Sequence, residues 1–202
     1  MIWGLRYRRA ESPPAATLQS PRLILRPAVM GDYPQWKAVR QANYTYLKPF
    51  EPAWPDGCLT ADFFARRLRR LWREWEGDRT YAFLIFLKDG TLIGALNVNN
   101  VTRGAANYAS LGYWLDDGSQ GQGYMTEAGF SVLDFAFEAL RLSRMNAATL
   151  PLNRKSQAML LRLGFSEEGF ARKYIQIDGR RQDHILYGLD AADFSGAAGK
   201  AG

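Results

Sequence analysis

The sequence predicts a mixed α/β domain in which most strands are antiparallel. Apolar runs at 81–87 and 91–100 flank Lys88-Asp89-Gly90, a pattern typical of a β-hairpin. Between Thr60 and Gly77, apolar residues recur at the spacing of an amphipathic helix. A glycine-rich loop at 118–123 then leads from a strand into a second helix. These observations together indicate an α/β layout with the glycine loop at a strand-to-helix junction.

The remaining elements are expected in the following order. The first strand is expected at 22–27, and Asp32 is expected to begin a helix that tolerates Pro34 in its first turn. A proline- and aromatic-rich loop at 46–57 precedes the amphipathic helix. After the hairpin we expect a strand at 107–116, a helix from about 124 to 140, a strand at 145–150, a helix at 154–163 that Gly164 ends, and strands at 170–177 and 182–189.

Length and composition limit the classes of protein that this sequence can represent. The 202 residues favour one domain, expected at 21–190, with an irregular arm at 1–20 and a disordered tail at 191–202. No apolar run is long enough to span a bilayer, and the first residues lack the pattern of a secretory signal. A single cysteine, Cys58, excludes an internal disulfide, and no Cys/His cluster predicts a metal site. We therefore expect a cytoplasmic protein.

The formal net charge of +6 favours an anionic partner. A phosphate-bearing cofactor, RNA or an acidic protein surface would each fit this charge, and so would a surface that is basic only for solubility. Five arginines on the amphipathic helix are expected opposite its apolar stripe: Arg66, Arg67, Arg69, Arg70 and Arg73. They could contact ribosomal RNA, or they could form a solvated helix face.

The glycine loop can hold an anion. The start of a helix presents unpaired N–H groups and the positive end of the helix dipole, and glycines at 121 and 123 let an anion approach those groups closely. A nucleotide-binding P-loop is excluded because Tyr124-Met125 stands where Lys-Ser/Thr is required. A dinucleotide-binding loop is excluded because Thr126 replaces its third glycine. A loop whose glycines only permit a tight turn remains an alternative.

The segment "LGYWLDDGSQGQGYMTEA" resembles the acetyl-CoA loop of the GNAT family of N-acetyltransferases, Gln/Arg-x-x-Gly-x-Gly/Ala. Gly121 and Gly123 match its two glycine positions, whereas Gly118 stands where the family has Gln or Arg. The resemblance implies the GNAT fold. This is a mixed, mostly antiparallel twisted sheet of about seven strands flanked by about four helices, and it is splayed between the fourth and fifth strands.

Further segments are similar to a narrower group, the ribosomal-protein-alanine N-acetyltransferases of the RimJ type. These are "YLKPFEP", "NVTRG", "LGYW", "QGQGYMTEA", "NRKSQAMLLRLGF" and "IDGRRQDHILYGL", spread from about residue 22 to 189. The likeness implies transfer of acetyl from acetyl-CoA to the N-terminal amine of a ribosomal protein, in the cytoplasm or on an assembling small ribosomal subunit, without a metal. A small amine or an antibiotic as acceptor is an alternative. A ribosome- or RNA-binding module with a vestigial CoA site is an alternative of another class.

The resemblance also assigns residues to the donor site. It implies that pantetheine pairs with the exposed edge of the splayed strand at Trp114 and Leu115, and that Asn153 contacts the pantetheine arm or caps the next helix. A backbone N–H near Trp114 or Leu115 is the expected oxyanion donor. The amides that are expected to bind the pyrophosphate belong to Gln120, Gly121, Gln122, Gly123, Tyr124 and Met125.

The catalytic acid and base are harder to assign. Many relatives carry a tyrosine acid four residues before the Gly-Phe glycine, a position that is Leu160 here, so we expect Ser156 to protonate the leaving thiolate or to pack beneath pantetheine. Asp183 and His184 are candidates for facing the acceptor amine, although a lone histidine is often structural. Glu51 is a candidate for gripping a cationic amine, or it is a solvated loop carboxylate. Cys58 has no readable base partner, so an acyl-enzyme is not expected.

Overall fold

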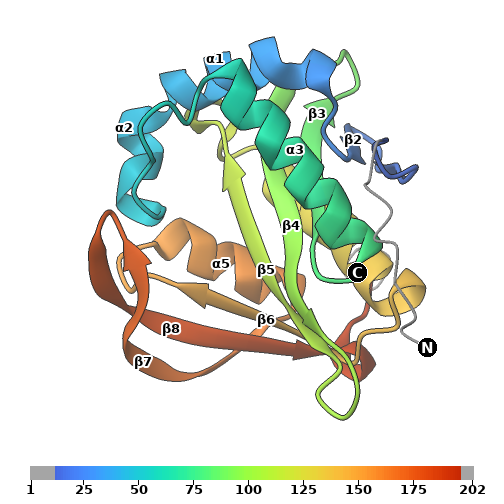
Figure 1. The fold of residues 1–202 in the computed structure, drawn as a ribbon. Helices are drawn as coiled ribbons and strands as arrows, with labels where there is room; N and C mark the ends of the chain where they lie inside the picture. The colour runs from blue at the N-terminus through green and yellow to red at the C-terminus, as the bar shows by residue number, and fades with distance from the viewer. Residues whose placement is uncertain (1–11, 197–202) are drawn as a thin grey trace, which may run out of the picture.

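The computed structural model of the protein describes residues 12–196, and Figure 1 shows one twisted sheet with helices on both faces. The sheet has eight strands in the order β1-β2-β3-β4-β5-β6-β8-β7, and all neighbours are antiparallel except β5 and β6. The strands are β1 (Leu18–Gln19), β2 (Leu23–Arg26), β3 (Tyr81–Leu87), β4 (Leu92–Thr102), β5 (Tyr108–Leu115), β6 (Arg144–Thr149), β7 (Ser166–Ile177) and β8 (Arg180–Asp190). The mixed, mostly antiparallel sheet is confirmed, with one short strand more than expected.

Five α-helices accompany the sheet, and four of them have ten residues or more. They are α1 (Tyr33–Ala42), α2 (Tyr44–Leu47), α3 (Ala61–Glu76), α4 (Tyr124–Asp134) and α5 (Arg154–Leu163). A π-helical turn, Phe135–Ala139, continues α4 to the end that the sequence predicts. The short helix α2 and the 3₁₀ turn η2 (Lys48–Phe50) occupy part of the stretch that was expected to be a loop, because Pro49 fits the first turn of a helix.

Capping residues set the limits of the helices. The Thr60 hydroxyl accepts a hydrogen bond from the Phe63 N–H at 3.3 Å and begins α3, as expected. Gly164, at φ 100°, ends α5 in the left-handed conformation that glycine adopts without strain. Asp32 precedes α1, but its carboxylate instead accepts from the Val29 N–H at 2.8 Å and pairs with Arg26.

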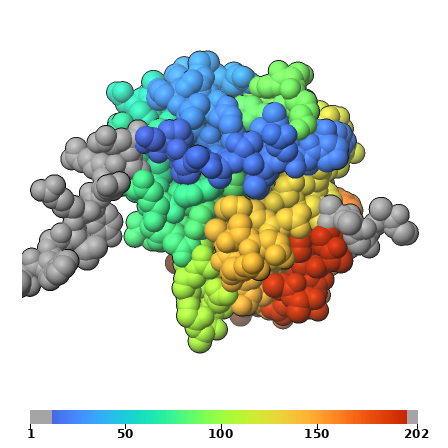
Figure 2. Space-filling model, turned by 90° about the vertical axis from the view of Figure 1, so that its right-hand side faces the viewer, coloured from blue at the N-terminus to red at the C-terminus, as the bar shows by residue number. Residues whose placement is uncertain are grey.

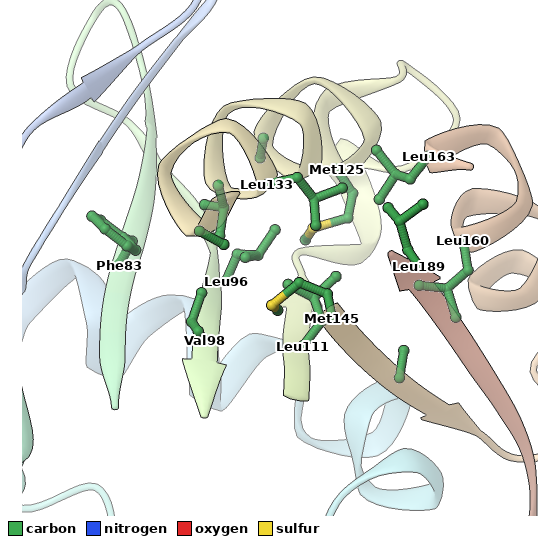
Figure 3. Close-up of a cluster of buried hydrophobic side chains, with 14 of the residues drawn as sticks. Phe83, Leu96, Val98, Leu111, Met125, Leu133, Met145, Leu160, Leu163 and Leu189 are labelled. Atoms are coloured by element: carbon green, nitrogen blue, oxygen red, sulfur yellow. The ribbon is translucent and has the colours of Figure 1, made fainter. Parts of the chain in front are cut away.

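Two hydrophobic clusters hold the two layers of helices to the sheet. The larger cluster fills the face beneath α4 and α5, and Figure 3 shows Leu111, Met145 and Leu160 converging there. The smaller cluster joins α1 and α3 to the opposite face through residues such as Trp36 and Phe64. Each fully buried leucine or phenylalanine contributes on the order of 1.5–3 kcal/mol, so both layers are firmly attached.

The strands β5 and β6 separate along their length. They pair in parallel only from Tyr108 opposite Arg144 to Ser110 opposite Asn146. Beyond Ser110, β5 continues to Leu115 beside β4, while β6 continues beside β8. Figure 1 shows the two strands diverging as a V, with α2 and α5 near its open end. The expected splay is confirmed, and it exposes one backbone edge of β5.

Both ends of the described chain pack against the domain. Ser20 and Arg22 bind Glu127 of α4, and in Figure 2 the N-terminal segment in blue lies directly against the yellow helix. At the other end, Ala191–Asp193 forms a 3₁₀ turn, and the Phe194 ring lies 5.2 Å from that of Phe137. Residues 191–194 of the tail that was expected to be disordered are therefore packed against the domain. The expectations for 1–11 and 197–202 lie outside the described residues.

Candidate active site

The alternation of β5 decides which backbone groups face the open V. The Asp116 N–H donates to Ile93 O at 2.8 Å, so even-numbered residues of β5 direct their backbone toward β4. A Cβ added to Gly94 would lie only 2.5 Å from Trp114 O, which confirms that direction. The backbone groups of Tyr113 and Leu115 therefore face the V. The expectation for Leu115 agrees with this geometry, whereas that for Trp114 is wrong and Tyr113 takes its place.

The glycine loop forms a cradle of backbone amides at the start of α4. Gly121 and Gly123 have φ values of 73° and 79°. Residues that carry a Cβ atom rarely adopt this left-handed conformation. A Cβ on Gly121 would meet nothing within 4 Å, so that side of the loop is open. Gly123 is the N-cap of α4 and no side chain caps this helix start. The loop therefore fits an anionic diphosphate, as the sequence predicts.

One of the predicted amides is already used inside the loop. The Gln120 N–H donates to Asp117 O at 3.2 Å and closes a 3₁₀ turn, so the predicted role of this amide is wrong. The Gln120 side chain instead bonds Asp117 Oδ1 at 2.9 Å and accepts from Lys155 Nζ at 2.6 Å. Lys155 is thereby placed beside the loop, where its charge favours an anion.

Arg22 is a second cation beside the loop that the sequence did not reveal. Its Nη1 donates to Gln122 O at 2.9 Å, and its guanidinium lies 4.6 Å from the centre of the Tyr124 ring. Glu127 fixes the same guanidinium through Nε at 2.6 Å. Arg22 lies about a hundred residues before the loop, and only the packing of β2 beside α4 brings the two together.

Ser156 lies at the first turn of α5, in contact with β5. Asn153 caps this helix, because its Oδ1 accepts from the Ser156 N–H at 3.2 Å. The Ser156 Oγ makes a short hydrogen bond with the Tyr113 hydroxyl. Burial raises the pKa of Tyr113 above its usual value, although the bond to Ser156 opposes this. The sequence predicted Ser156 but not its tyrosine partner, which comes from a different element.

Glu51 is an ion-paired residue and not a free carboxylate. Arg40 binds both of its oxygens, at 2.7 and 2.5 Å, and the Trp54 indole donates to it at 2.8 Å. The Arg40 guanidinium also lies 4.2 Å from the centre of the Trp54 ring. The expectation of a solvated loop carboxylate is therefore wrong, because Arg40 balances the charge of Glu51, while a role of Glu51 toward the acceptor amine stays a prediction.

The same segment is attached to the β7–β8 turn across the open end of the V. The Asp178 N–H donates to Glu51 O at 2.9 Å. Lys48 Nζ and the Asp178 carboxylate lie 3.8 Å apart, and both side chains are about half exposed, at 47%. We call this pair of contacts the η2–turn tie. It connects the half of the sheet that ends in β5 with the half that begins at β6.

Asp183 and His184 serve the β7–β8 hairpin. Asp183 accepts the Lys173 N–H at 2.7 Å and stabilises an irregular part of β7, where Lys173 has a φ of 49°. The His184 ring is buried, with Nδ1 bonded to Gln182 O at 3.0 Å and the Tyr174 ring against it. Successive strand residues point to opposite faces and each of the two has a structural partner, so they do not act as one pair. A role of either residue toward the acceptor amine stays a prediction.

The arginines of α3 do not form one exposed face. Arg66, Arg69, Arg70 and Arg73 are exposed, and Arg70 pairs with Glu74 at 3.8 Å. Arg67 instead lines a cavity between α3 and the sheet, and burial lowers its pKa to about 10. The expectation of an exposed Arg67 is therefore wrong. The sequence pattern placed it opposite the apolar stripe with the other arginines, and only the packing of α3 against the sheet reveals its position at the cavity wall.

Cys58 lies outside the V. It lines a broad surface groove between α1 and the 54–61 segment, and its thiol is free. Within residues 12–196, no group of three or more His, Cys, Asp or Glu side chains is placed to hold a metal ion. Over the same residues, no helix has the length and apolarity that crossing a membrane would require.

Known proteins with a similar sequence share most of this chain. The model of the Acetyltransferase (GNAT) domain family matches residues 22–166. A probable N-acetyltransferase of Bacillus subtilis, YjcK, is 33% identical over 85% of this chain and 96% of its own. The [ribosomal protein uS5]-alanine N-acetyltransferase of Escherichia coli is 31% identical over 90% of this chain and 94% of its own.

Solved structures agree with these sequence relatives. RimJ of Mycobacterium smegmatis, solved in complex with CoA-disulfide, superimposes with a TM-score of 0.83 at 33% identity, covering 91% of this chain and 90% of that one. The ribosomal-protein-S5-alanine acetyltransferase of Vibrio fischeri gives a TM-score of 0.82 at 30% identity, over 89% and 99%. The V between β5 and β6, the amide cradle and these matches together show that the chain belongs to the GNAT family of N-acetyltransferases.

Proposed function

We propose that this protein transfers the acetyl group of acetyl-CoA to the N-terminal α-amine of a ribosomal protein, with alanine as the first residue. The observation that carries the proposal is the left-handed glycine cradle beside the exposed edge of β5, in a chain similar over its length to enzymes named for that reaction. Transfer is direct, within a complex of enzyme, acetyl-CoA and acceptor.

The donor half of the site supplies contacts that suit acetyl-CoA. The free amides from Gly121 to Met125 suit the pyrophosphate, and Arg22 and Lys155 add positive charge beside them. The edge of β5 at Tyr113 and Leu115 suits the pantetheine amides, which would extend the sheet as a strand does. Asn153, at the mouth of the V, is proposed to contact the same arm while it caps α5.

The reaction requires three events that these residues can support. The amine nitrogen attacks the thioester carbonyl carbon, and a backbone N–H of Leu115 or Tyr113 stabilises the oxyanion. The carbon–sulfur bond then breaks, and the thiolate takes a proton from Ser156. Tyr113 is hydrogen-bonded to that hydroxyl, passes its own proton to Ser156 and regains one from solvent before the next turnover. The products are the acetylated terminus and CoA, and the amine loses its extra proton to solvent.

The charges near the acceptor side favour an α-amine. Glu51 is neutralised by Arg40, while Asp183 and His184 have structural partners, so the carboxylates and the histidine that were candidates for the base are occupied. An α-amine has a pKa of about 8 and a lysine about 10.4, so at neutral pH the α-amine has a much larger neutral fraction and needs a weaker base. The charge of Arg67, which has no paired carboxylate, also disfavours the ammonium form of an acceptor and disfavours polyamines.

The test is to incubate the enzyme and labelled acetyl-CoA with unacetylated ribosomal proteins, both free and within subunits, and to locate the label by mass spectrometry. We expect label on the alanine terminus of one protein. Label on lysine side chains only, or rapid transfer to small amines with none to protein, would contradict the proposal. A comparison of free protein with subunits also tests whether the exposed arginines of α3 contribute to docking on RNA.

A further inference from the structure

Arg67 is a half-buried cation that lines a cavity and has no hydrogen-bonded counter-ion. Among the residues that the structure describes, no hydrogen bond or ion pair reaches its guanidinium, and no aromatic ring stacks on it. The nearby carboxylates are already bound: both oxygens of Glu51 pair with Arg40, and Glu74 pairs with Arg70. An unpaired, partly desolvated cation at the wall of a cavity marks a candidate site for an anionic group.

The cavity that Arg67 lines is apolar apart from a second free polar group. Its walls are formed by Trp36, Phe64, Trp72 and other apolar side chains, together with Asn97 of β4. Within 12–196 the Asn97 side chain makes no hydrogen bond to another residue. The cavity measures about 30 Å³, roughly twice what one water occupies. This size suits a small terminal group such as a carboxylate.

The cavity adjoins the acceptor side of the V. Trp114 belongs to its wall, and the Trp114 ring centre lies 5.0 Å from the Arg40 guanidinium that holds Glu51. Trp114 also lies between Tyr113 and Leu115, whose backbone faces the V. The cavity is thus on the α1–α3 face of β5, opposite the face where Tyr113 meets Ser156.

We propose that Arg67 and Asn97 form a subsite that binds a carboxylate of the acceptor and so selects acidic acceptors. This inference rests on the proposed function, because it concerns the acceptor of the same site. A guanidinium binds a carboxylate through two parallel N–H···O bonds, and the amide of Asn97 can donate a third. Partial loss of hydration lowers the pKa of Arg67, although the guanidinium stays charged at neutral pH. A bound carboxylate would compensate for the hydration that the guanidinium has lost.

The first test uses matched peptides that begin with alanine and carry glutamate or glutamine at the second, third or fourth position. At one position we expect kcat/KM to be about tenfold higher for glutamate than for glutamine. In Arg67→Gln this ratio should fall to about one. In Arg69→Gln, which removes the same charge from an exposed position of α3, the ratio should remain. If the wild type shows no preference for glutamate, or if the preference survives Arg67→Gln, then the subsite does not bind the carboxylate of an acceptor side chain.

A second arm distinguishes the source of the carboxylate. If the subsite takes the α-carboxylate of a short acceptor, free alanine should be preferred over alaninamide, and Arg67→Gln should remove this preference. Acetylation of α-amines without either preference would refute the subsite while the proposed function stands. No acetylation of any α-amine would instead refute the proposed function.

A third measurement does not depend on turnover. Glutarate, a simple dicarboxylate, should raise the melting temperature of the wild type and of Arg69→Gln, but not that of Arg67→Gln. Without ligand, Arg67→Gln should melt no lower than the wild type, because it removes an unpaired charge. A lower melting temperature with no glutarate effect in any variant would show that Arg67 is structural.

Discussion

The two faces of the sheet at β5 hold different kinds of groups. On the α4–α5 face, the site consists of backbone amides, glycines and the Tyr113–Ser156 hydroxyl pair. On the α1–α3 face, it consists of guanidinium, carboxylate and indole groups, such as Arg40, Glu51 and Trp114. Backbone amides recognise the unchanging diphosphate of a donor, whereas long side chains recognise an acceptor that differs between enzymes. The difference indicates that changes on the first face should affect all transfer, and changes on the second should affect the choice of acceptor.

The largest effect is expected from Gly121→Glu. A side chain at a φ of 73° is strained, and its carboxylate would occupy the open side of the amide cradle. We expect acetyl-CoA affinity to fall by at least about 100-fold, measured by calorimetry, with an unchanged circular dichroism spectrum. Gly104→Glu is the matched control, since Gly104 also has open space and a φ of 75° but lies in the β4–β5 turn. Equal affinity in both variants would show that the loop does not hold the donor.

The next effect concerns the hydroxyl pair. Ser156→Ala and Tyr113→Phe should each lower kcat by about 100-fold, because the departing thiolate loses its source of a proton. Their effects should not add, since both act on the same proton. CoA affinity should stay within about twofold, because the proton matters in the transition state. Tyr33→Phe, which loses a hydroxyl bonded to Leu59 O, is the control. Full activity in Tyr113→Phe would leave Ser156 to act alone.

A smaller effect is expected on the other face. Glu51→Gln leaves the Arg40 guanidinium without its partner, and we expect a loss of about 1–3 kcal/mol in unfolding free energy, measured by urea titration. The KM for the acceptor peptide should rise severalfold while CoA affinity is unchanged. A loss of kcat by 100-fold or more in the folded variant would instead indicate that Glu51 is the catalytic base. The α1–α3 face would then affect the rate of transfer and not only the choice of acceptor.

The smallest effect is expected from Cys58→Ala. Cys58 lies in the groove outside the V, so the substitution should leave kcat and KM within about twofold. Mass spectrometry of the enzyme mixed with acetyl-CoA should find no acetylated cysteine. Detection of a thioester on Cys58 that decays on addition of acceptor would show transfer in two steps.

The sequence predicts the donor face much better than the acceptor face. Gly121, Gly123, Asn153 and Ser156 are local signals, because the conformation or the cap that each provides depends on its neighbours in the chain. The partners of Glu51 and Ser156 could not be read in the same way. Arg40 and Tyr113 come from other elements, and their orientation is fixed only by packing.

The direction of the backbone groups in β5 is another feature that depends on packing and that the sequence does not reveal. The β5 segment is evident from its residues, but the sequence does not tell which backbone groups face β4. One hydrogen bond, from Asp116 to Ile93, decides between Trp114 and its neighbours. Likewise, the helical period places Arg67 opposite the apolar stripe, whereas in the structure it lines the cavity between α3 and the sheet.

The η2–turn tie has a mechanical consequence. Three residue pairs between β5 and β6 close the V at one end, and the η2–turn tie closes it at the other. The cleft between the two strands is therefore bounded at both ends. The two closures differ in strength. Ladder hydrogen bonds beside a packed core resist opening, whereas one backbone bond and an exposed ion pair at 3.8 Å contribute only about 0–2 kcal/mol. The tie is therefore the weaker of the two ends, and we expect the cleft to open more easily there than at the paired end.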